Sequence, residues 1–348
     1  MIIGCHFSTH GGFSFGNSIT IPRLWWNLIE MGGNFGVDVF IIISGYYLIK
    51  NDSFKINWNK ALKLWGQIFF YSIIMFVISL VITKGDFHIT NLIRALLPVT
   101  FSEWWFASAY FVLYLIHPFI NKFLSSLDKR QYQIYLVSII IIWSIIPMLT
   151  NSSFQSNALI EFIMYYSIAG YIRLFGIGNN FSSKKWLVIW LFASLILFIS
   201  SLSIMIVGLK ISSISNHAVH FYHRNSLFVI VQSVAFFMLF LNTKIKYSSV
   251  INKIASATFG IYLIHDSNLL RPIIWKDIFK NALYQNTAMI IPYSIMVTIL
   301  VFIFCAIIDI LRQSTIEKPF LKFANKVSIK IEELLNLFID FVSNKILK

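Results

Sequence analysis

The chain has 348 residues, of which 57% are hydrophobic and 12% charged, and its formal net charge is +14. A soluble domain carries about a quarter charged residues, so this composition excludes an ordinary soluble protein. The two cysteines, Cys5 and Cys305, lie far apart in apolar segments, so a disulfide framework or a cysteine-based metal cluster is not expected.

Apolar stretches long enough to cross a bilayer recur along the whole chain. The clearest are WLVIWLFASLILFISSLSIMIV at 186–207 and AMIIPYSIMVTILVFIFCAII at 288–308. A membrane-spanning helix needs about 20 residues, and these stretches predict an all-α fold, a polytopic transmembrane helical bundle. The spans are expected, in chain order, at 35–49, 66–83, 104–121, 133–149, 158–172, 186–207, 226–241, 254–269 and 288–309.

The opening stretch MIIGCHFSTHGG resembles the remnant of one more span, from Met1 to about Phe15. Its apolar part is short and soon turns polar and glycine-rich, whereas a spanning helix needs about 20 residues. We therefore expect about ten spans, the first of them truncated at its inner half. A short re-entrant segment is the alternative interpretation.

The distribution of Lys and Arg among the predicted loops indicates the orientation. Alternate loops, together with the C-terminal segment, hold 20 of the 28 basic residues, and the loops of the other side hold 8. Basic loops remain in the cytoplasm, so we expect a multi-pass protein of the cell (plasma) membrane with a cytoplasmic C-terminus. The positive loops favour membrane lipid or a phosphate-bearing substrate as partners, and no nucleic acid is expected.

The last segment, 313–348, differs in pattern from the predicted transmembrane domain, 1–312. Apolar residues follow helical spacing, for example at Val327, Ile331 and Leu334, while Lys and Glu occupy the other face. This pattern predicts a cytoplasmic amphipathic helical tail that lies on the inner leaflet.

Ionisable side chains inside a bilayer are costly and often functional. His6 and His10 are four residues apart and would share one face of a helix. No further cluster of metal-ligand residues completes a site with them, so no metal is expected. A structural polar contact and a general base remain, and His6 suits the second role because imidazole titrates near neutrality.

Four further ionisable residues fall in or near the predicted spans. Asp38, in GVDVFIIISGYYLIK, is either an interfacial carboxylate or a group that orients a histidine of the first helix. Glu161 lies one turn inside the predicted outer surface, and His265 ends FGIYLIH near that surface. Interfacial and acceptor-facing roles are open for both. His117, before Pro118, is expected to snorkel to the inner interface.

On the predicted cytoplasmic side, NKALKLW carries Lys60 and Lys63 one helical turn apart. Two ammonium groups at this spacing can bind a polyphosphate. They also fit the positive-inside pattern alone, so both interpretations remain.

Four motifs, in order, resemble the integral-membrane acyltransferase family 3. They are GVDVFIIISGYYL, EWWFASAYFVLYLIHPFI, FIMYYSIAGYIRLFG and TFGIYLIHDSNLLR, and the resemblance extends from His6 to about residue 312. Members acylate sugars of surface polysaccharides, lipopolysaccharide and peptidoglycan. The chain is similar to bacterial O-acetyltransferases that modify exopolysaccharide or capsule.

The resemblance implies roles for three residues. His6 takes the place of a catalytic histidine that follows an arginine of the same helix, and that arginine would precede Met1. Lys60 and Lys63 take the place of two arginines that hold the phosphates of coenzyme A. Lysine keeps the charge of arginine but loses its bidentate geometry.

The implied reaction moves an acetyl group from acetyl-CoA to a hydroxyl of a surface polysaccharide or a lipid-linked sugar, although succinyl and other acyl groups stay open. His6 would remove the hydroxyl proton, or would be acylated first and pass the group on. Asp38 would act with His6, while His10, His265 and Glu161 would face the acceptor. Proteins of polysaccharide assembly are further expected partners.

Two other functions are alternatives. A glycan or lipid transporter (a flippase) would use scattered polar residues within the membrane, but it predicts internal repeats with broken helices, and no convincing repeat is found. A non-catalytic scaffold of polysaccharide assembly would depend on neither His6 nor acyl-CoA.

Overall fold

The computed structural model describes residues 1–16, 18–50, 55–82, 84–85, 87–150, 152–178, 180–215 and 217–345, and within these ranges it contains helices and no strand. The predicted all-α class is confirmed. Within the same ranges, seven stretches are long and apolar enough to cross a membrane, which supports a multi-pass membrane protein. They are Ile21–Leu48, Trp58–Ile82, Lys129–Thr150, Ala158–Phe175, Ser183–Gly208, Ser212–Leu241 and Ile290–Val342.

Some predicted spans differ in detail from the helices observed. The span expected at 35–49 is part of the longer helix α2 (Ile21–Leu48). The one expected at 254–269 is divided between α12 (Ser249–Ser256) and α13 (Thr258–His265). The one expected at 104–121 lies in α5 (Trp105–Ser126). The total of about ten spans stays a prediction.

The chain folds into two compact units. Unit 1 comprises Met1–Ser53, His117–Ser248 and Asn268–Phe302, and unit 2 comprises Phe54–Ile116, Ser249–Ser267 and Ile303–Lys348. Two of the boundaries fall within helices, namely α5 and α15 (Ile290–Arg312). The domain boundary predicted at residue 312 stays a prediction. That residue ends α15 and precedes a π-helical turn, η5 (Gln313–Glu317).

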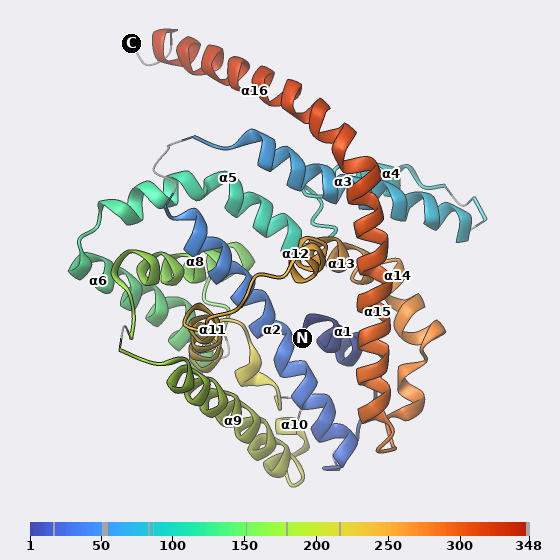
Figure 1. Ribbon diagram of the computed structural model, residues 1–348. Helices are drawn as coiled ribbons and strands as arrows, with labels where there is room; N and C mark the ends of the chain where they lie inside the picture. The colour runs from blue at the N-terminus through green and yellow to red at the C-terminus, as the bar shows by residue number, and fades with distance from the viewer. Residues whose placement is uncertain are drawn as a thin grey trace. The chain divides into compact units, whose positions relative to one another are not determined.

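Unit 1 is built around α2, whose most extensive contacts are with four helices (Figure 1). These are α1 (Ile2–His10), α8 (Ala158–Phe175), α9 (Ser183–Gly208) and α11 (Leu227–Leu241). The shorter elements of this unit are α6 (Lys129–Ile140), η1 (Ile141–Ile145), α7 (Ile146–Thr150), α10 (Ser212–Ser215), η2 (His220–Tyr222), α14 (Leu270–Pro272), η3 (Ile273–Ile278) and η4 (Asn281–Tyr284).

Local sequence explains where α2 begins. Thr20 caps the helix, since its side chain accepts a hydrogen bond from the Arg23 backbone N–H at 3.4 Å, and Pro22 lies in the first turn. Further along, Phe35 and Val39 pack in a core with Leu197 of α9. This packing buries the apolar face of α2 and makes it the central helix of unit 1.

Close packing of α2 against α8 depends on Gly45. A Cβ atom at this position would lie 3.0 Å from Ala169 Cβ and 3.1 Å from the Tyr166 backbone. Glycine at such a point lets two helix backbones approach, as expected for small residues in membrane helices.

Unit 2 is built around α3 (Trp58–Ile82), which contacts α4 (Ile89–Leu96), α13 and α16 (Lys318–Lys345). Gly66 of α3 faces the ring of Phe320, and a Cβ atom there would overlap it. Helix α16 exposes Leu334, Leu337 and Phe338. The predicted helical tail is therefore present as a helix, while its cytoplasmic location stays a prediction.

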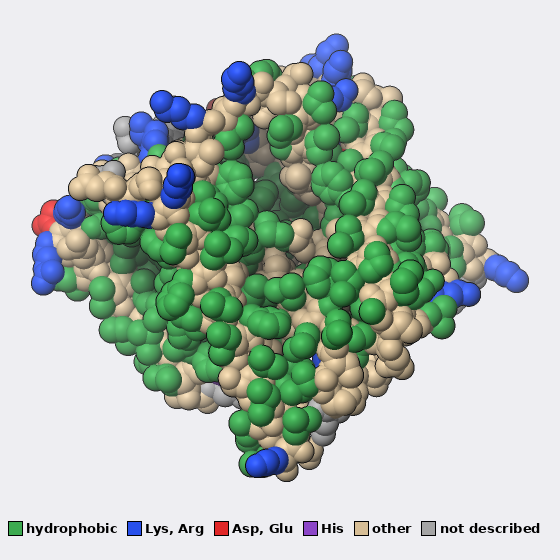
Figure 2. Space-filling model, turned by 60° about the horizontal axis from the view of Figure 1, so that its bottom comes forward, with side chains coloured by type: hydrophobic (Ala, Val, Ile, Leu, Met, Phe, Trp, Pro, Cys, Tyr) green, Lys and Arg blue, Asp and Glu red, His purple; other side chains and the backbone are tan. Residues whose placement is uncertain are grey.

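The surface is rich in hydrophobic side chains, as a bilayer-facing surface must be. Figure 2 shows such side chains covering much of the face in view, with Lys and Arg at separated places. On α9, Val188 and Phe192 are 64% and 63% exposed. Water would penalise this exposure, whereas lipid tails accommodate it.

Two glycines of α2 provide a matched test of this packing. Gly45→Ala should lower the thermal unfolding temperature in detergent relative to Gly32→Ala, by the equivalent of about 1 kcal/mol or more. Both changes gain helix propensity, but a Cβ atom at Gly32 meets Met1 at an ordinary 3.6 Å. Equal unfolding temperatures for the two variants would contradict the close contact at Gly45.

Candidate functional site

Helix α1 carries both histidines of the first predicted segment and packs against α2. His6 and His10 are half-buried, and their ring centroids are 5.3 Å apart, as expected for residues one turn apart on one helix face. The approach to α2 depends on Gly33, because a Cβ atom there would overlap Cys5. The predicted shared face of the two histidines is therefore observed.

Further contacts hold α1 in place. Phe7 is buried, and its ring meets Trp275 of η3 edge-on, with 6.2 Å between the ring centroids. Trp26 Nε1 donates a hydrogen bond to the Ser8 carbonyl at 2.9 Å, and Asn281 Nδ2 donates to the Phe7 carbonyl at 3.4 Å. These bonds satisfy carbonyls that a helix end leaves without partners, so α1 holds its histidines on a fixed support.

His10, at the end of α1, lines a cavity of about 260 Å³ together with Arg271 and Lys276. Helix α1 is not among the seven candidate spans. The pKa of His10 is lowered to about 4, first because burial disfavours the imidazolium and then because Arg271 and Lys276 are positive. His10 is therefore neutral at pH 7 and adds hydrogen-bonding capacity to the cavity rather than charge.

Asp38 belongs to a second group of polar side chains in unit 1. It is fully buried in α2, which is not what an interfacial carboxylate would show. Its carboxyl group interacts electrostatically with Arg224 and Glu161, and it also interacts with the hydroxyl of Tyr165. Arg224 also forms an ion pair of 2.8 Å with Glu161, and its backbone carbonyl accepts a hydrogen bond from Tyr165. The structure therefore brings Asp38 and Glu161 together around one arginine.

Glu161 also lines a cavity of about 270 Å³ with Ser156, His220 and other polar residues. The Ser156 hydroxyl donates to Glu161 Oε1 at 3.3 Å. The Nε2 atom of His220 donates to the Met148 carbonyl at 2.9 Å, because a carbonyl oxygen can only accept. A polar cavity suits the predicted acceptor-facing role of Glu161, which stays a prediction.

In unit 2, Lys60 and Lys63 lie at the start of α3 with exposed side chains. Asn57 Oδ1 accepts a hydrogen bond from the Lys60 backbone N–H at 3.1 Å, which caps this end of the helix. Lys63 Nζ forms an ion pair of 2.6 Å with Glu317 of η5. A polyphosphate bound by both lysines would have to compete with Glu317 for Lys63.

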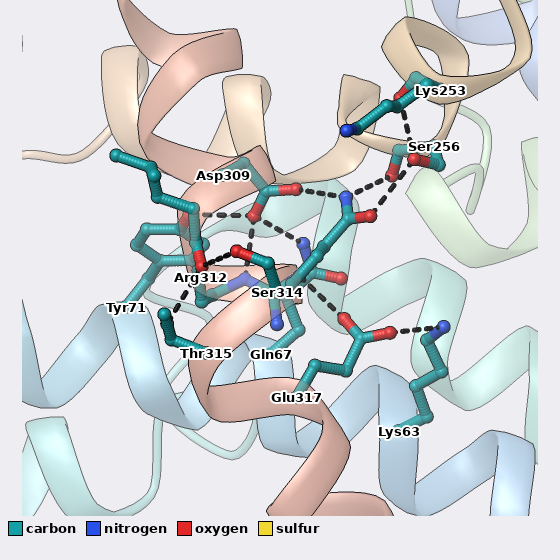
Figure 3. Close-up of polar contacts among 12 residues, drawn as sticks. Lys63, Gln67, Tyr71, Lys253, Ser256, Asp309, Arg312, Ser314, Thr315 and Glu317 are labelled. Atoms are coloured by element: carbon teal, nitrogen blue, oxygen red, sulfur yellow. Dashed lines mark hydrogen bonds and ion pairs between the residues drawn. The ribbon is translucent and has the colours of Figure 1, made fainter.

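A buried polar network extends from this ion pair (Figure 3). Asp309 is fully buried and accepts hydrogen bonds from Tyr71 Oη at 2.7 Å and from Gln67 Nε2 at 3.2 Å, both on α3. It also accepts from Arg312 Nε at 2.7 Å. Arg312 in turn donates to Glu317 at 2.9 Å, so two carboxylates share one guanidinium.

The backbone around Asp309 leaves room for this network. Gln313, in the π-helical turn, donates to Asp309 at 2.8 Å and to the Ser256 carbonyl at 3.1 Å. A Cβ atom at Gly260 of α13 would overlap the Asp309 carboxylate. Single π-helical turns occur frequently at functional sites. The sequence interpretation missed this network, although a lone aspartate at the end of the predicted span 288–309 was a signal for it.

Two further histidines are buried. His265, at the end of α13, is 1% exposed, and its Nδ1 donates to the Ile261 carbonyl at 2.6 Å. His117 is also 1% exposed, so the expectation that it snorkels to the interface is wrong. The part of α5 that carries it is packed inside unit 1, where Asn121, one turn on, donates to the Leu48 carbonyl at 2.8 Å.

A protein-family model matches most of the chain. The sequence model of the acyltransferase 3 family, described as an acyltransferase domain, matches residues 1–310. The chain belongs to acyltransferase family 3. The resemblance seen in the four motifs is thereby confirmed. No curated protein and no solved structure matches the chain.

Membership in the acyltransferase 3 family supports acyl transfer in general and a membrane location. The matched range includes α1 with His6, α2 with Asp38, and the start of α3 with Lys60 and Lys63. The roles of these residues stay predictions. The sequence pattern alone did not point to Arg224, Arg271 or Arg312, which belong to the clusters of the two units.

The Asp309 network can be tested by removing either its centre or one of its donors. Asp309→Ala should lower the free energy of unfolding by about 3–5 kcal/mol, because it leaves Arg312 with Glu317 alone and removes the acceptor of the buried donors Tyr71 and Gln67. Tyr71→Phe removes a single hydrogen bond and should cost about 1 kcal/mol. Denaturant unfolding in detergent micelles measures both. Similar small losses for the two variants would show that the buried charge is not held as described.

Proposed function

We propose that the protein is a membrane-embedded O-acyltransferase. It moves an acetyl group from cytoplasmic acetyl-CoA to a hydroxyl of a cell-surface or lipid-linked glycan. The observation that carries the proposal is the family match over residues 1–310. That match supports acyl transfer, while the donor, the acceptor and the base are parts of the proposal.

His6 is the proposed general base. The acceptor oxygen forms a bond to the thioester carbonyl carbon while His6 takes the hydroxyl proton. The carbon–sulfur bond then breaks, and the departing coenzyme A thiolate takes the proton from His6. In the alternative order, His6 attacks the thioester carbonyl and coenzyme A leaves as its thiolate; the acceptor oxygen then takes the acetyl group from the imidazole, and its proton goes to the thiolate. Support for this role comes from the half-buried position of His6 on a firmly packed helix.

Asp38 is proposed to act with His6 through positioning rather than proton transfer. Both residues belong to α1–α2, the helix pair held together at Gly33. Asp38 is fully buried, and the positive charge of Arg224 acts on its carboxylate. A buried carboxyl group beside an arginine restricts the arrangement of the neighbouring polar groups, because other arrangements would take the arginine away from it.

The phosphates of acetyl-CoA are proposed to bind Lys60 and Lys63 at the start of α3. Lys60 is exposed, and Lys63 Nζ is 2.6 Å from Glu317. Phosphate carries more negative charge than a carboxylate, so it can displace Glu317 from Lys63. Glu317 would keep its hydrogen bond to Arg312, so the buried network need not break when the donor binds.

The base can be tested in membranes that contain the full chain and are supplied with radiolabelled acetyl-CoA. Label should enter the surface glycan, and His6→Ala should reduce this transfer by about 100-fold or more. His217→Ala, a change in an exposed loop, is the matched control and should leave transfer unchanged. Persisting transfer in His6→Ala would move the base elsewhere. Transfer by none of the chains would overturn the proposed acetyl donor or acceptor and favour the transporter alternative.

The donor site predicts a separate effect on substrate affinity. Lys60→Gln and Lys63→Gln should each raise the KM for acetyl-CoA by about tenfold with little change in kcat, because each removes one phosphate contact. Lys129→Gln removes an equal charge at the start of α6 and serves as the control. An unchanged KM in the Lys60 and Lys63 variants would mean that these lysines do not contact acetyl-CoA and only reflect the positive-inside pattern.

A further inference from the structure

The cavity beside His10 is lined by two cationic side chains, those of Arg271 and Lys276. Its volume is about 260 Å³, and its lining includes Thr9, His10, Asn268, Arg271 and Lys276. Among the described residues that line it, none is Asp or Glu. Ligand pockets usually measure about 300–1,000 Å³, so this cavity suits one small group rather than a long segment.

The two cations are held by the local fold. Arg271 Nη2 donates a hydrogen bond to Asn268 Oδ1 at 3.2 Å, which orients the guanidinium. Lys276 lies in η3, and its stem passes Gly12, where a Cβ atom would meet Lys276 Cε at 3.6 Å. Gly12 has a φ of +73°, a backbone conformation that favours glycine. This turn lets the chain after α1 close over the lysine stem.

The two cations come from consecutive helical elements, since Arg271 lies in α14 and Lys276 lies in the π-helical turn η3 that follows it. Trp275, between the cations, is fully buried and packs against Phe7 of α1. The wall that bears the cations is thereby fixed to the helix that bears His6.

We propose that this cavity binds a negatively charged group of the acceptor, a carboxylate or a phosphate, and so selects an anionic glycan. The proposal rests on the proposed function, since it places the acceptor at His6. The His10 ring, which lines the cavity, is 5.3 Å from the His6 ring, centroid to centroid. A single sugar unit that carries both a hydroxyl and an anionic group can bridge one helical turn of about 5.4 Å.

The chemistry of the lining fits this class of ligand. Arg presents planar donors that match a carboxylate or a phosphate, and Lys adds a point charge. A neutral sugar would gain little from two cations. The positive-inside rule does not account for them either, because Arg271 and Lys276 are among the 8 basic residues of the predicted loops that are poorer in Lys and Arg.

The test uses the purified full chain in detergent and measures binding of four probes: glucuronate, glucose 1-phosphate, glucose and acetyl-CoA. The unmodified protein should bind at least one anionic sugar more tightly than glucose. Arg271→Gln and Lys276→Gln should each weaken this preference by about tenfold and leave acetyl-CoA binding unchanged. Lys280→Gln, in the same segment but not in the lining, is the matched control and should bind as the unmodified protein does.

Each result has a defined meaning. A preference for glucuronate assigns the site to a carboxylate, and one for glucose 1-phosphate assigns it to a phosphate. No preference over glucose, or equal binding by all variants, would overturn the proposal. Loss of acetyl-CoA binding would overturn it too, because the cations would then serve the donor. Arg271→Lys keeps the charge and should retain part of the preference, which separates charge from misfolding.

The test also separates this inference from the proposed function. Anionic-sugar binding should persist in His6→Ala, even though acyl transfer is lost. His6→Ala could abolish transfer while the unmodified protein shows no preference for anionic sugars. That result would keep His6 as the base and refute only the anionic acceptor. Binding with the preference but without acyl transfer in the unmodified protein would refute the reaction instead.

Discussion

The packing of α1 on α2 is the contact on which the proposed chemistry depends. α1 has nine residues, and isolated helices shorter than about 12–15 residues are marginal in water. Its helical form, and with it the direction of the His6 side chain, must therefore come from its partners. Gly33 lets the two backbones approach, and the contact of Phe7 with Trp275 holds another part of α1. The position of His6 is thus a property of tertiary packing rather than of local propensity.

Each unit buries an aspartate in a helix from the set of candidate spans. Asp38 and Asp309 are both fully buried, and each lies near an arginine that also pairs with a glutamate. Burying such groups is costly, and apolar residues of similar volume would often be as stable. At Asp309 the charge adds discrimination, because a helix that rotates or slides would break the hydrogen bonds that its carboxylate accepts. A bundle rich in Phe, Leu and Ile has few other means of fixing its register.

The sequence predicted the fold class well because hydropathy acts locally and over long stretches, and four motifs sufficed to indicate the family. It placed the start of α2 too late, since NLIEMGGN interrupts the apolar run, although Thr20 and Pro22 give a clear start signal. Cluster partners were out of reach for a different reason. Tyr71 and Asp309 are 238 residues apart, and no periodicity reports such a contact. Lys63 shows the consequence: its spacing from Lys60 is visible in the sequence, but its ion pair with Glu317 is not.

Charge distinguishes the two cavities described in unit 1. The cavity at Glu161 contains a carboxylate that Arg224 neutralises, together with serine and histidine side chains. The cavity at His10 contains two cations and no carboxylate among the described lining residues. Its histidine is neutral at pH 7 and does not add to their charge. A neutral glycan would distinguish the two cavities only by shape, whereas an anionic one is drawn to the second. Because the second cavity begins one turn from His6, the same field that selects an anionic acceptor also delivers its hydroxyl to the proposed base.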